Sequence, residues 1–354
     1  MDRTAVLMLF GGESSEHDVS ISSARNVYAA IDDEKYDVQL CYIDREGKWW
    51  QIDEFGAQVD TSDALQLLPV LGEAKLRVEP DGIDLPVDVI LPILHGRNGE
   101  DGTVQGLAQL LHAPIVGCDV TASALAMNKL ACKEVLFANE LPVIPYAVHR
   151  GYETKPDFSK LTMRLGNPLF VKPARAGSSV GVRKVTHEAE FVAALDEAHK
   201  HDEIALIEKA IIGQELEVAV LGTPPNHQVS GVGEIIPGDD FYSYDDKYAS
   251  GSTAQVLTDA NIDQAMEQKI KDIAGRAYVA LDCRGLARVD FVLGNDGELY
   301  VMEVNTMPGF TNISMYPKLW RKAGISYPEL IEKLIDDALR NGTMNAVNEE
   351  ESWN

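Results

Sequence analysis

Cysteines, aromatic residues and basic runs are scarce in this chain of 354 residues. The four cysteines are scattered without CxxC spacing, which favours reduced, buried thiols and a cytoplasmic location. Aromatic residues make up 7% of the chain and do not alternate with basic residues, so no platform for stacking nucleotide bases is indicated. The formal net charge of −25 argues against nonspecific binding to nucleic acid.

Long apolar runs and two common nucleotide-binding motifs are also missing. No run is long enough to span a membrane, and residues 1–3 lead into an expected strand rather than the apolar core of a signal peptide. Neither GxxxxGK(S/T) nor a GxGxxG before a helix occurs, which disfavours a Walker-type ATPase and a nicotinamide enzyme. We therefore expect a cytoplasmic globular protein of two or three domains, with no membrane or nucleic-acid partner.

The first third of the chain alternates expected strands and helices. Short apolar runs predict strands at residues 4–10, 36–43 and 87–94, and helical spacing of apolar residues predicts a helix at 14–31. This order predicts an α/β protein whose amino-terminal domain is a small, doubly wound parallel sheet, with ligands at the carboxyl ends of the strands. Gly11-Gly12 and His95-Gly96 lie at such ends.

Later segments predict further domains. Strands are expected at 168–173, 180–185, 204–207 and within 215–234, and helices at 122–140, 191–199, 261–281 and 327–339. We place domains at residues 1–120, 121–212 and 213–341, followed by a flexible tail at 342–354.

Residues 288–305 predict a β-hairpin whose register can be counted. Asp296-Gly297 between two alternating runs is a strong signal for a two-residue loop. Counting outward from that loop gives the pairs Asn295–Glu298, Phe291–Met302, Asp290–Glu303, Val289–Val304 and Arg288–Asn305. Phe291, Met302, Val289 and Val304 would form a core face.

Asp290 opposite Glu303 would place two carboxylates across one ladder, where they repel each other. A divalent cation between them reverses that effect, since Mg²⁺ takes oxygen ligands from carboxylates and phosphates. Asn305 would add another oxygen, and Arg288 would lie beside the metal. Without a metal, neutralising either carboxylate would relieve the repulsion and raise the melting temperature. A hairpin with a solvated acidic face is an equally good interpretation of this pattern alone.

A loop at 172–181 joins two expected strands and is rich in potential hydrogen-bond donors. Its backbone N–H groups could close over triphosphate oxygens, and Lys172 and Lys129 could meet phosphate as point charges. A plain Gly/Ser turn is the commoner structure for such a loop, and the neighbouring metal site favours the nucleotide. Residues 207–211 could offer backbone atoms to adenine. Glu215 could accept ribose hydroxyls, although a solvated carboxylate is commoner.

Six segments together resemble the ATP-grasp fold and, more sharply, the D-alanine–D-alanine ligase family. They are GGESSEHDVS at 11–20, HGRNGEDG at 95–102, MNK at 127–129, GSSVG at 177–181, YSYDDKY at 242–248 and NTMPG at 305–309. The resemblance runs from the first expected strand to about Leu339. It implies that 1–120 is an amino-terminal substrate domain, 121–212 a central ATP-grasp domain and 213–341 a carboxy-terminal catalytic domain.

The resemblance implies an enzyme that uses ATP to phosphorylate one D-alanine, after which the amine of a second D-alanine attacks the acyl phosphate. The product, D-alanyl-D-alanine, serves peptidoglycan precursor synthesis. Two Mg²⁺ (or Mn²⁺) ions would be held by Asp290, Glu303 and Asn305, with Glu303 shared. Arg288 and the Gly309 N–H would stabilise the oxyanion. The family also implies a homodimer.

The resemblance assigns the remaining sites residue by residue. Glu16 would hold the ammonium of the first substrate next to His95, and Ser178 and Tyr248 would form a hydrogen-bonded set with Glu16. Ser314 and Met315 would line the second-substrate subsite. ATP would be bound by Lys129, Lys172, Glu208, Lys209, Ala210, Ile211, Glu215 and Lys247.

Several alternatives stay open within this resemblance. Ligases that use D-lactate tend to have Phe at the Tyr248 position, and those that use D-serine often have Arg at the Met315 position, so both residues here favour D-alanine. His17-Asp18 and Ala174 depart from common family residues, which leaves fine substrate preference open. Another ATP-grasp carboxylate–amine ligase is disfavoured by the segments at 11–20 and 242–248. A non-catalytic ATP-binding regulator is disfavoured by Arg288.

Residues 238–253 form a polar, aromatic segment without periodicity. Its composition and its expected place beside the site predict a lid that becomes ordered when substrates bind.

Overall fold

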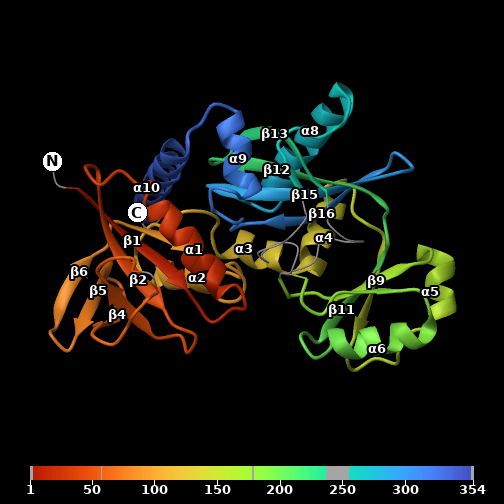
Figure 1. Ribbon diagram of the computed structural model, residues 1–354, viewed down its shortest axis with the longest axis horizontal. Helices are drawn as coiled ribbons and strands as arrows, with labels where there is room; N and C mark the ends of the chain where they lie inside the picture. Colours follow the sequence, from red (N-terminus) through yellow and green to blue (C-terminus); the bar gives the residue numbers. More distant parts are fainter. Residues whose placement is uncertain (1–2, 57, 178, 237–254, 352–354) are drawn as a thin grey trace.

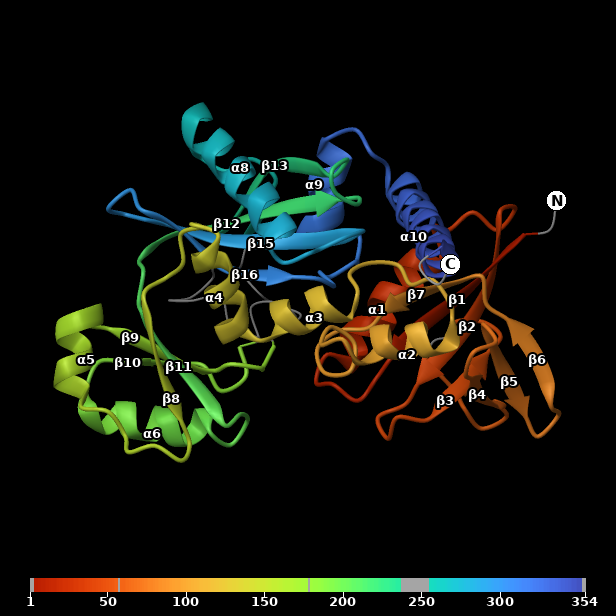
Figure 2. The ribbon, with the colours of Figure 1, turned by 180° about the vertical axis from the view of Figure 1, so that it is seen from behind.

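The computed structural model describes residues 3–56, 58–177, 179–236 and 255–351, which form three β-sheets with helices packed around them (Figure 1). The first and second sheets lie at opposite ends of the molecule, and the third lies between and above them (Figures 1 and 2). All four cysteines are buried and free. Within the described residues, no helix is long and apolar enough to cross a membrane.

The first sheet has a parallel centre and an antiparallel extension. Its order is β6-β5-β4-β3-β2-β1-β7, and β1 (Thr4–Gly11) pairs in parallel with β2 (Tyr36–Ile43) and β7 (Val89–Ile93). These three strands confirm the predicted parallel sheet. The antiparallel part was not predicted, because its strands are only four or five residues long: β3 (Trp49–Ile52), β4 (Gln66–Val70), β5 (Lys75–Glu79) and β6 (Ile83–Pro86).

Alternate residues of β1 face two different cores. Val6, Met8 and Phe10 pack with α1 (His17–Tyr28) and α10 (Tyr327–Glu351), whereas Leu7 and Leu9 pack with α2 (Thr103–Leu111). A parallel sheet covered by helices on both faces needs apolar residues at every position, which explains the continuous apolar run. The sheet thus presents the carboxyl ends of β1 and β7 at one edge.

The closing helix α10 returns the chain to this first domain. It packs against β7, and Lys35 forms an ion pair with Glu332. The predicted helix at 327–339 is confirmed, but α10 continues to Glu351 and includes most of the segment expected as a tail.

The second sheet is antiparallel, with the order β10-β9-β11-β8. Its strands are β8 (Tyr146–Arg150), β9 (Leu169–Pro173), β10 (Arg183–Val185) and β11 (Ile204–Lys209). Two helices, α5 (Phe158–Leu165) and α6 (Glu188–Ala198), contribute to the core of this domain. The predicted helical stretch at 122–140 is two helices, α3 (Val120–Met127) and α4 (Lys129–Ala138), separated by Asn128, whose side chain caps α4.

The third sheet carries the predicted hairpin at one edge. Its order is β14-β13-β12-β15-β16, all antiparallel, with β12 (Gly213–Leu221), β13 (Gln228–Ile236), β14 (Gln255–Leu257), β15 (Leu286–Gly294) and β16 (Leu299–Asn305). Helix α8 (Gln264–Ala280) packs on Leu216 and Val218 of one face, and α9 (Met315–Lys322) packs near Ala219 of the other.

The hairpin turn differs from the prediction. The Gly294 N–H donates to the Glu298 carbonyl at 2.8 Å, so the loop has three residues, 295–297, rather than two. Gly297 has φ +83°, the left-handed conformation that ends a three-residue hairpin loop.

A β-bulge compensates for this longer loop. The register shifts after Asp290, so that Phe291 pairs with Val301 and the predicted pair of Phe291 with Met302 is wrong. Beyond the bulge the predicted register holds, and Asp290 pairs with Glu303. The pairs Val289–Val304 and Arg288–Asn305 are confirmed as well.

Candidate active site

Three carboxylates lie in one row across three adjacent strands of the third sheet. Glu217 on β12 is in register with Asp290 on β15, which is in register with Glu303 on β16. The sequence prediction missed Glu217, although its alternation with buried Leu216 and Val218 already places it on the opposite face.

The Arg288 guanidinium lies against this row. Its Nε and Nη2 each donate to one carboxylate oxygen of Asp290, both at 2.7 Å, and its Nε lies 3.3 Å from Glu217 Oε2. Burial opposes the charged form, but Asp290 and Glu217 outweigh it and raise the pKa of Arg288 well above its ordinary value. Arg288 is therefore a fixed cation at this site.

Lys129 connects the other end of the row to the loop after β9, at residues 174–181, which we call the glycine loop. Its Nζ lies 3.4 Å from Glu303 Oε2 and donates to the Ala176 carbonyl at 2.9 Å. Its backbone N–H donates to the Ala174 carbonyl, also at 2.9 Å. The start of α4, the glycine loop and the acidic row therefore meet at one residue.

The donor chemistry of the row fits a hard divalent cation. Asp290 and Glu303 face the same side of adjacent strands, as Mg²⁺ ligands would. Asn305 Oδ1 accepts from the Met307 N–H at 3.1 Å, which orients its amide. Within the described ranges, no three His, Cys, Asp or Glu side chains are grouped to hold a metal, so a bound ion would also need Asn305 and ligand oxygens.

The structure corrects the expected repulsion between Asp290 and Glu303. Each carboxylate has a cation within 3.4 Å: Arg288 for Asp290 and Lys129 for Glu303. Neutralising one carboxylate would therefore remove an attraction rather than relieve a repulsion.

A second charge cluster includes Lys172 of β9, the residue at which the loop at 172–181 was predicted to begin. Glu208 on β11 is buried, and its carboxylate lies 2.8 Å from Lys172 Nζ and 3.1 Å from Lys133 Nζ. Burial would raise the pKa of Glu208, but the two lysines together hold it below the ordinary value. Lys133 was not predicted. It is 1% exposed and lies one helical turn after Lys129, a spacing that could have indicated it.

Further residues expected to bind ATP lie at the end of β11 and along β12. The Lys209 N–H donates to the Pro145 carbonyl at 2.9 Å, and the Ala210 N–H donates to the Pro168 carbonyl at 3.3 Å. These two N–H groups are therefore occupied, and adenine would contact other atoms of this segment, which continues into Ile211. Glu215 precedes Glu217 by two residues and thus shares its face of β12.

Glu16 and His95 lie together, as predicted, at the carboxyl ends of β1 and β7. Ser14 Oγ donates to the His95 carbonyl at 2.6 Å and accepts from the Glu16 N–H at 3.1 Å. A Cβ at Gly96 would lie 3.0 Å from Glu16 Oε2. A Cβ at Gly177 would lie 3.5 Å from the same oxygen, so the glycine loop approaches this carboxylate.

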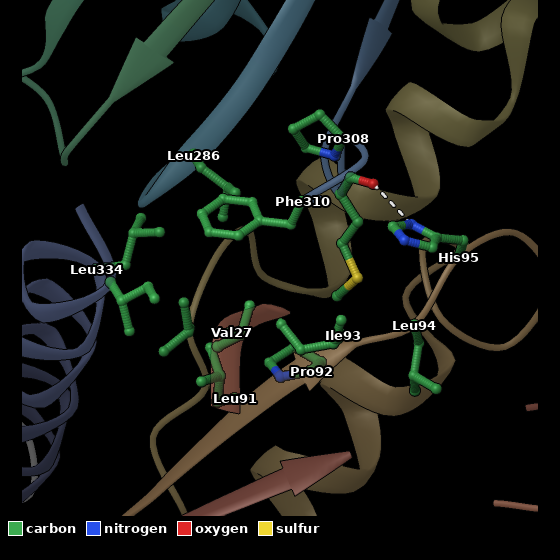
Figure 3. A pocket seen from close by; sticks show the side chains of 13 residues that line it. Val27, Leu91, Pro92, Ile93, Leu94, His95, Leu286, Pro308, Phe310 and Leu334 are labelled. Atoms are coloured by element: carbon green, nitrogen blue, oxygen red, sulfur yellow. Dashed lines mark hydrogen bonds between the residues drawn. The ribbon is translucent and has the colours of Figure 1, made fainter. Parts of the chain in front are cut away.

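The His95 ring bridges two domains and is flanked by an apolar cavity (Figure 3). Its Nδ1 lies 3.1 Å from the Met307 carbonyl, and its Nε2 lies 3.3 Å from Ser23 Oγ. Burial lowers the pKa of His95, although Glu16 acts in the opposite direction. A neutral ring can donate one N–H to Met307, which fixes the loop that leads to Gly309.

Glu100 is a further carboxyl group that the sequence prediction missed. One of its oxygens accepts from the Gly96 N–H at 2.6 Å. Burial and the nearby Glu16 raise the pKa of Glu100 to about 8. Glu100 therefore retains its proton near neutral pH, next to Glu16. Glu100 lies inside the motif segment at 95–102, and this position could have indicated it as a site residue.

Gly309 and Ser314 are also brought together. A Cβ at Gly309 would lie 3.0 Å from Ser314 Oγ, so the absence of a side chain keeps this contact possible. Met315 is 4% exposed and its sulfur packs against Gly233 of β13, within the core. Ser178, Lys247 and Tyr248 lie outside the described residues, as does the segment at 238–253.

Two family models match successive parts of this chain. Residues 5–118 match the family described as D-ala D-ala ligase N-terminus, and 135–336 match D-ala D-ala ligase C-terminus. The chain is 45% identical over 358 residues to D-alanine–D-alanine ligase A of Chromobacterium violaceum, covering 98% of each chain.

Two solved structures are similar over nearly the whole chain. The D-alanine-D-alanine ligase from Coxiella burnetii has a TM-score of 0.89 and 33% identity, covering 99% of this chain and 98% of that one. The VanG D-Ala:D-Ser ligase from Enterococcus faecalis has a TM-score of 0.86 and 32% identity, covering 95% and 99%. The predicted α/β, ATP-grasp fold is confirmed, and the chain belongs to the D-alanine–D-alanine ligase family of enzymes.

Proposed function

We propose that this protein joins two D-alanine molecules to give D-alanyl-D-alanine for peptidoglycan precursor synthesis. A carboxylate oxygen of the first D-alanine takes the γ-phosphoryl group of ATP, which yields an acyl phosphate and ADP. The amine nitrogen of the second D-alanine then bonds to the acyl carbon and loses a proton, and inorganic phosphate departs. The names of the related ligases support this substrate, and the site geometry supports this chemistry.

The observation that carries the proposal is the position of Lys129. Its Nζ is within 3.4 Å of Glu303 and bonded to the loop carbonyl of Ala176, so one cation lies between the acidic row and the glycine loop. A transferring phosphoryl group needs such a cation, because its charge spreads over several oxygens. Lys172, whose Nζ lies 2.8 Å from Glu208, would contribute a second cation once it turns from that carboxylate.

Two Mg²⁺ (or Mn²⁺) ions would supply charge neutralisation for the phosphate oxygens. Asp290, Glu303 and Asn305 would hold them, because these side chains supply hard oxygen donors on one edge of the sheet. Glu208, Lys209, Ala210, Ile211 and Glu215 would bind the adenosine part of ATP next to them, and Lys247 would complete the phosphate contacts.

The chain's own residues position the two D-alanine molecules. Glu16 would bind the ammonium of the first, because it lies beside His95 at the edge of the first sheet and the glycine loop approaches its carboxylate. Arg288 and the Gly309 N–H would stabilise the oxygen that becomes negative when the amine attacks. Ser314 would lie near the second carboxylate. Ser178 and Tyr248 would link Glu16 to loop closure.

The proposal includes a homodimer in the cytoplasm. Family resemblance supports the dimer. The four buried, free cysteines are compatible with a reducing compartment.

Product analysis tests this function directly. The protein would be incubated with ATP, Mg²⁺ and D-alanine, alone and with equal D-lactate or D-serine, while phosphate release is followed and products are identified by mass spectrometry. We expect D-alanyl-D-alanine as the main product at neutral pH. A main product containing D-lactate or D-serine would contradict the substrate assignment, and ATP turnover without any ligated product would contradict the reaction. Arg288→Lys keeps the charge but not the bidentate geometry, and we expect it to lose most activity.

A further inference from the structure

Arg288 lies between two carboxylates, only one of which is an expected metal ligand. Its side chain is 14% exposed, that of Asp290 is 12% exposed and that of Glu217 is 9% exposed. All three groups are therefore largely removed from water. Ionic contacts between such buried groups are screened only weakly. The Asp290 contact is bidentate at 2.7 Å, and the Glu217 contact is longer, at 3.3 Å.

Asp290 would have two cationic partners, the Arg288 guanidinium and a bound metal ion. It cannot hold both equally well. In the structure both of its carboxylate oxygens accept hydrogen bonds from Arg288. A divalent cation on the same carboxylate would repel the guanidinium, because two cations would then share one negative charge. A buried arginine that loses its carboxylate partner is strongly destabilised unless a second partner is within reach.

The strand order places that second partner on the side away from the metal. β15 lies between β12 and β16 (Figure 2). Glu217 and Glu303 therefore flank Asp290 from opposite sides. Two strand spacings separate their backbones by roughly 9 to 10 Å. An ion between Asp290 and Glu303 would thus lie on the β16 side, whereas the Arg288 guanidinium already contacts the β12 side.

We propose that Glu217 is a positioning residue that holds the Arg288 guanidinium when a divalent cation takes up the charge of Asp290. The inference rests on the proposed metal and nucleotide site, and it adds a role for a residue that contacts neither substrate nor metal. Glu217 keeps Arg288 charged, buried and aimed at the reacting oxygen, and it lowers the cost of separating Arg288 from Asp290.

Metal binding without turnover tests this role. Mn²⁺ affinity in the presence of ADP would be measured by electron paramagnetic resonance, so that the result does not depend on catalysis. In Glu217→Gln, Arg288 keeps Asp290 as its closest charged partner and competes harder with the metal. We expect Mn²⁺ affinity to fall about tenfold, the size of a lost charged hydrogen bond. Glu217→Asp keeps the charge and should recover part of the loss.

A double-mutant cycle separates positioning from direct ligation. In an Arg288→Met background there is no guanidinium to hold, so adding Glu217→Gln should change Mn²⁺ affinity by less than about threefold, from long-range charge alone. An undiminished tenfold loss in that background would make Glu217 a metal ligand and overturn the positioning role. The melting temperature of every variant would be measured to verify folding.

Glu234→Gln is the matched control. Glu234 is a buried carboxylate on β13 that contacts Gln214 and the Asn261 N–H, on the opposite face from Arg288, and its variant should bind Mn²⁺ like the wild type. Normal Mn²⁺ binding by the wild type with unchanged affinity in Glu217→Gln would overturn this inference alone. Failure of the wild type to bind Mn²⁺ with ADP would overturn both it and the proposed metal site.

Discussion

Arg288 and Asp290, two residues apart on β15, form a bidentate ion pair in which both N···O distances are 2.7 Å. Arg288 thus neutralises the Asp290 carboxylate, which the sequence analysis expected to repel Glu303. Glu217 lies on the other side of the guanidinium, so the Arg288 cation lies between two carboxylates. The stability of the metal-free protein at this edge of the sheet depends on these attractions.

Asp290→Asn should therefore lower the melting temperature of the metal-free protein. Asn can still accept a hydrogen bond, but the buried Arg288 loses its closest anionic partner, at a cost of about 1–3 kcal/mol in unfolding free energy. Differential scanning calorimetry in the presence of a chelator measures the change. Glu303→Gln is the comparison, and we expect a smaller loss because the Glu303 side chain is 34% exposed. A higher melting temperature for Asp290→Asn would restore the repulsion model.

Glu100 should make the stability of the protein fall as pH rises. The pKa of Glu100 is about 8 in the folded state and 4.5 in its ordinary state, so between these values the folded protein holds a proton that the unfolded chain has lost. Its contribution is fully present below pH 4.5 and is lost as pH rises through 8.

Glu100→Gln should flatten that dependence, which melting temperatures between pH 5 and pH 9 can measure. The variant cannot lose a proton, so it should gain on the wild type as pH rises. Equal slopes for the two proteins would contradict the raised pKa of Glu100. Glu203→Gln is a suitable control, because its side chain is 74% exposed.

Lys133→Met should destabilise the protein and weaken ATP binding. Glu208 would keep only Lys172 as a close cation, and removing one partner from a buried ion pair costs about 3–5 kcal/mol. Lys172 would then be held more tightly by Glu208 and would be less available to phosphate. Urea unfolding measures the stability, and we expect the KM for ATP to rise more than kcat falls.

Lys200→Met provides the control for Lys133. Lys200 pairs with Glu197, but its side chain is 68% exposed. Its removal should change the unfolding free energy by less than about 1 kcal/mol. If Lys133→Met behaved like Lys200→Met, the buried cluster would have no special importance.

Residues 238–253 are still predicted to form a lid over the site. Limited proteolysis should cleave this segment in the free protein, and ATP with a D-alanine phosphinate analogue should protect it. Cleavage at the same rate with and without these ligands would exclude a lid.

Tyr248→Phe tests the predicted choice of nucleophile. The variant removes a hydroxyl with little change in volume, so the fold should survive while dipeptide synthesis weakens. Because D-lactate carries no ammonium that must lose a proton, we expect measurable D-alanyl-D-lactate at acidic pH. Competition between equal D-alanine and D-lactate from pH 5 to pH 9 measures the product ratio. An unchanged ratio in the variant would refute the role of Tyr248.

Local sequence was sufficient for the features that depend on neighbours along the chain. Alternating apolar residues and a turn signal predicted that Asp290 would meet Glu303, because the side-chain period of a strand does not depend on distant residues. The parallel strands of the first sheet were predicted for a similar reason, since burial on both faces requires a continuous apolar run. The six motif segments likewise indicated the family.

Tertiary structure alone decided which charges meet. Glu217 reaches Arg288 only because β12 pairs with β15 across some 70 residues of intervening chain, and Lys133 reaches Glu208 only because α4 packs against the second sheet. The same holds for the bulge after Asp290, which cancels the unpredicted third loop residue and keeps the site in register. Long-range strand pairing and burial set these contacts, and neither leaves a periodic signal in the local sequence.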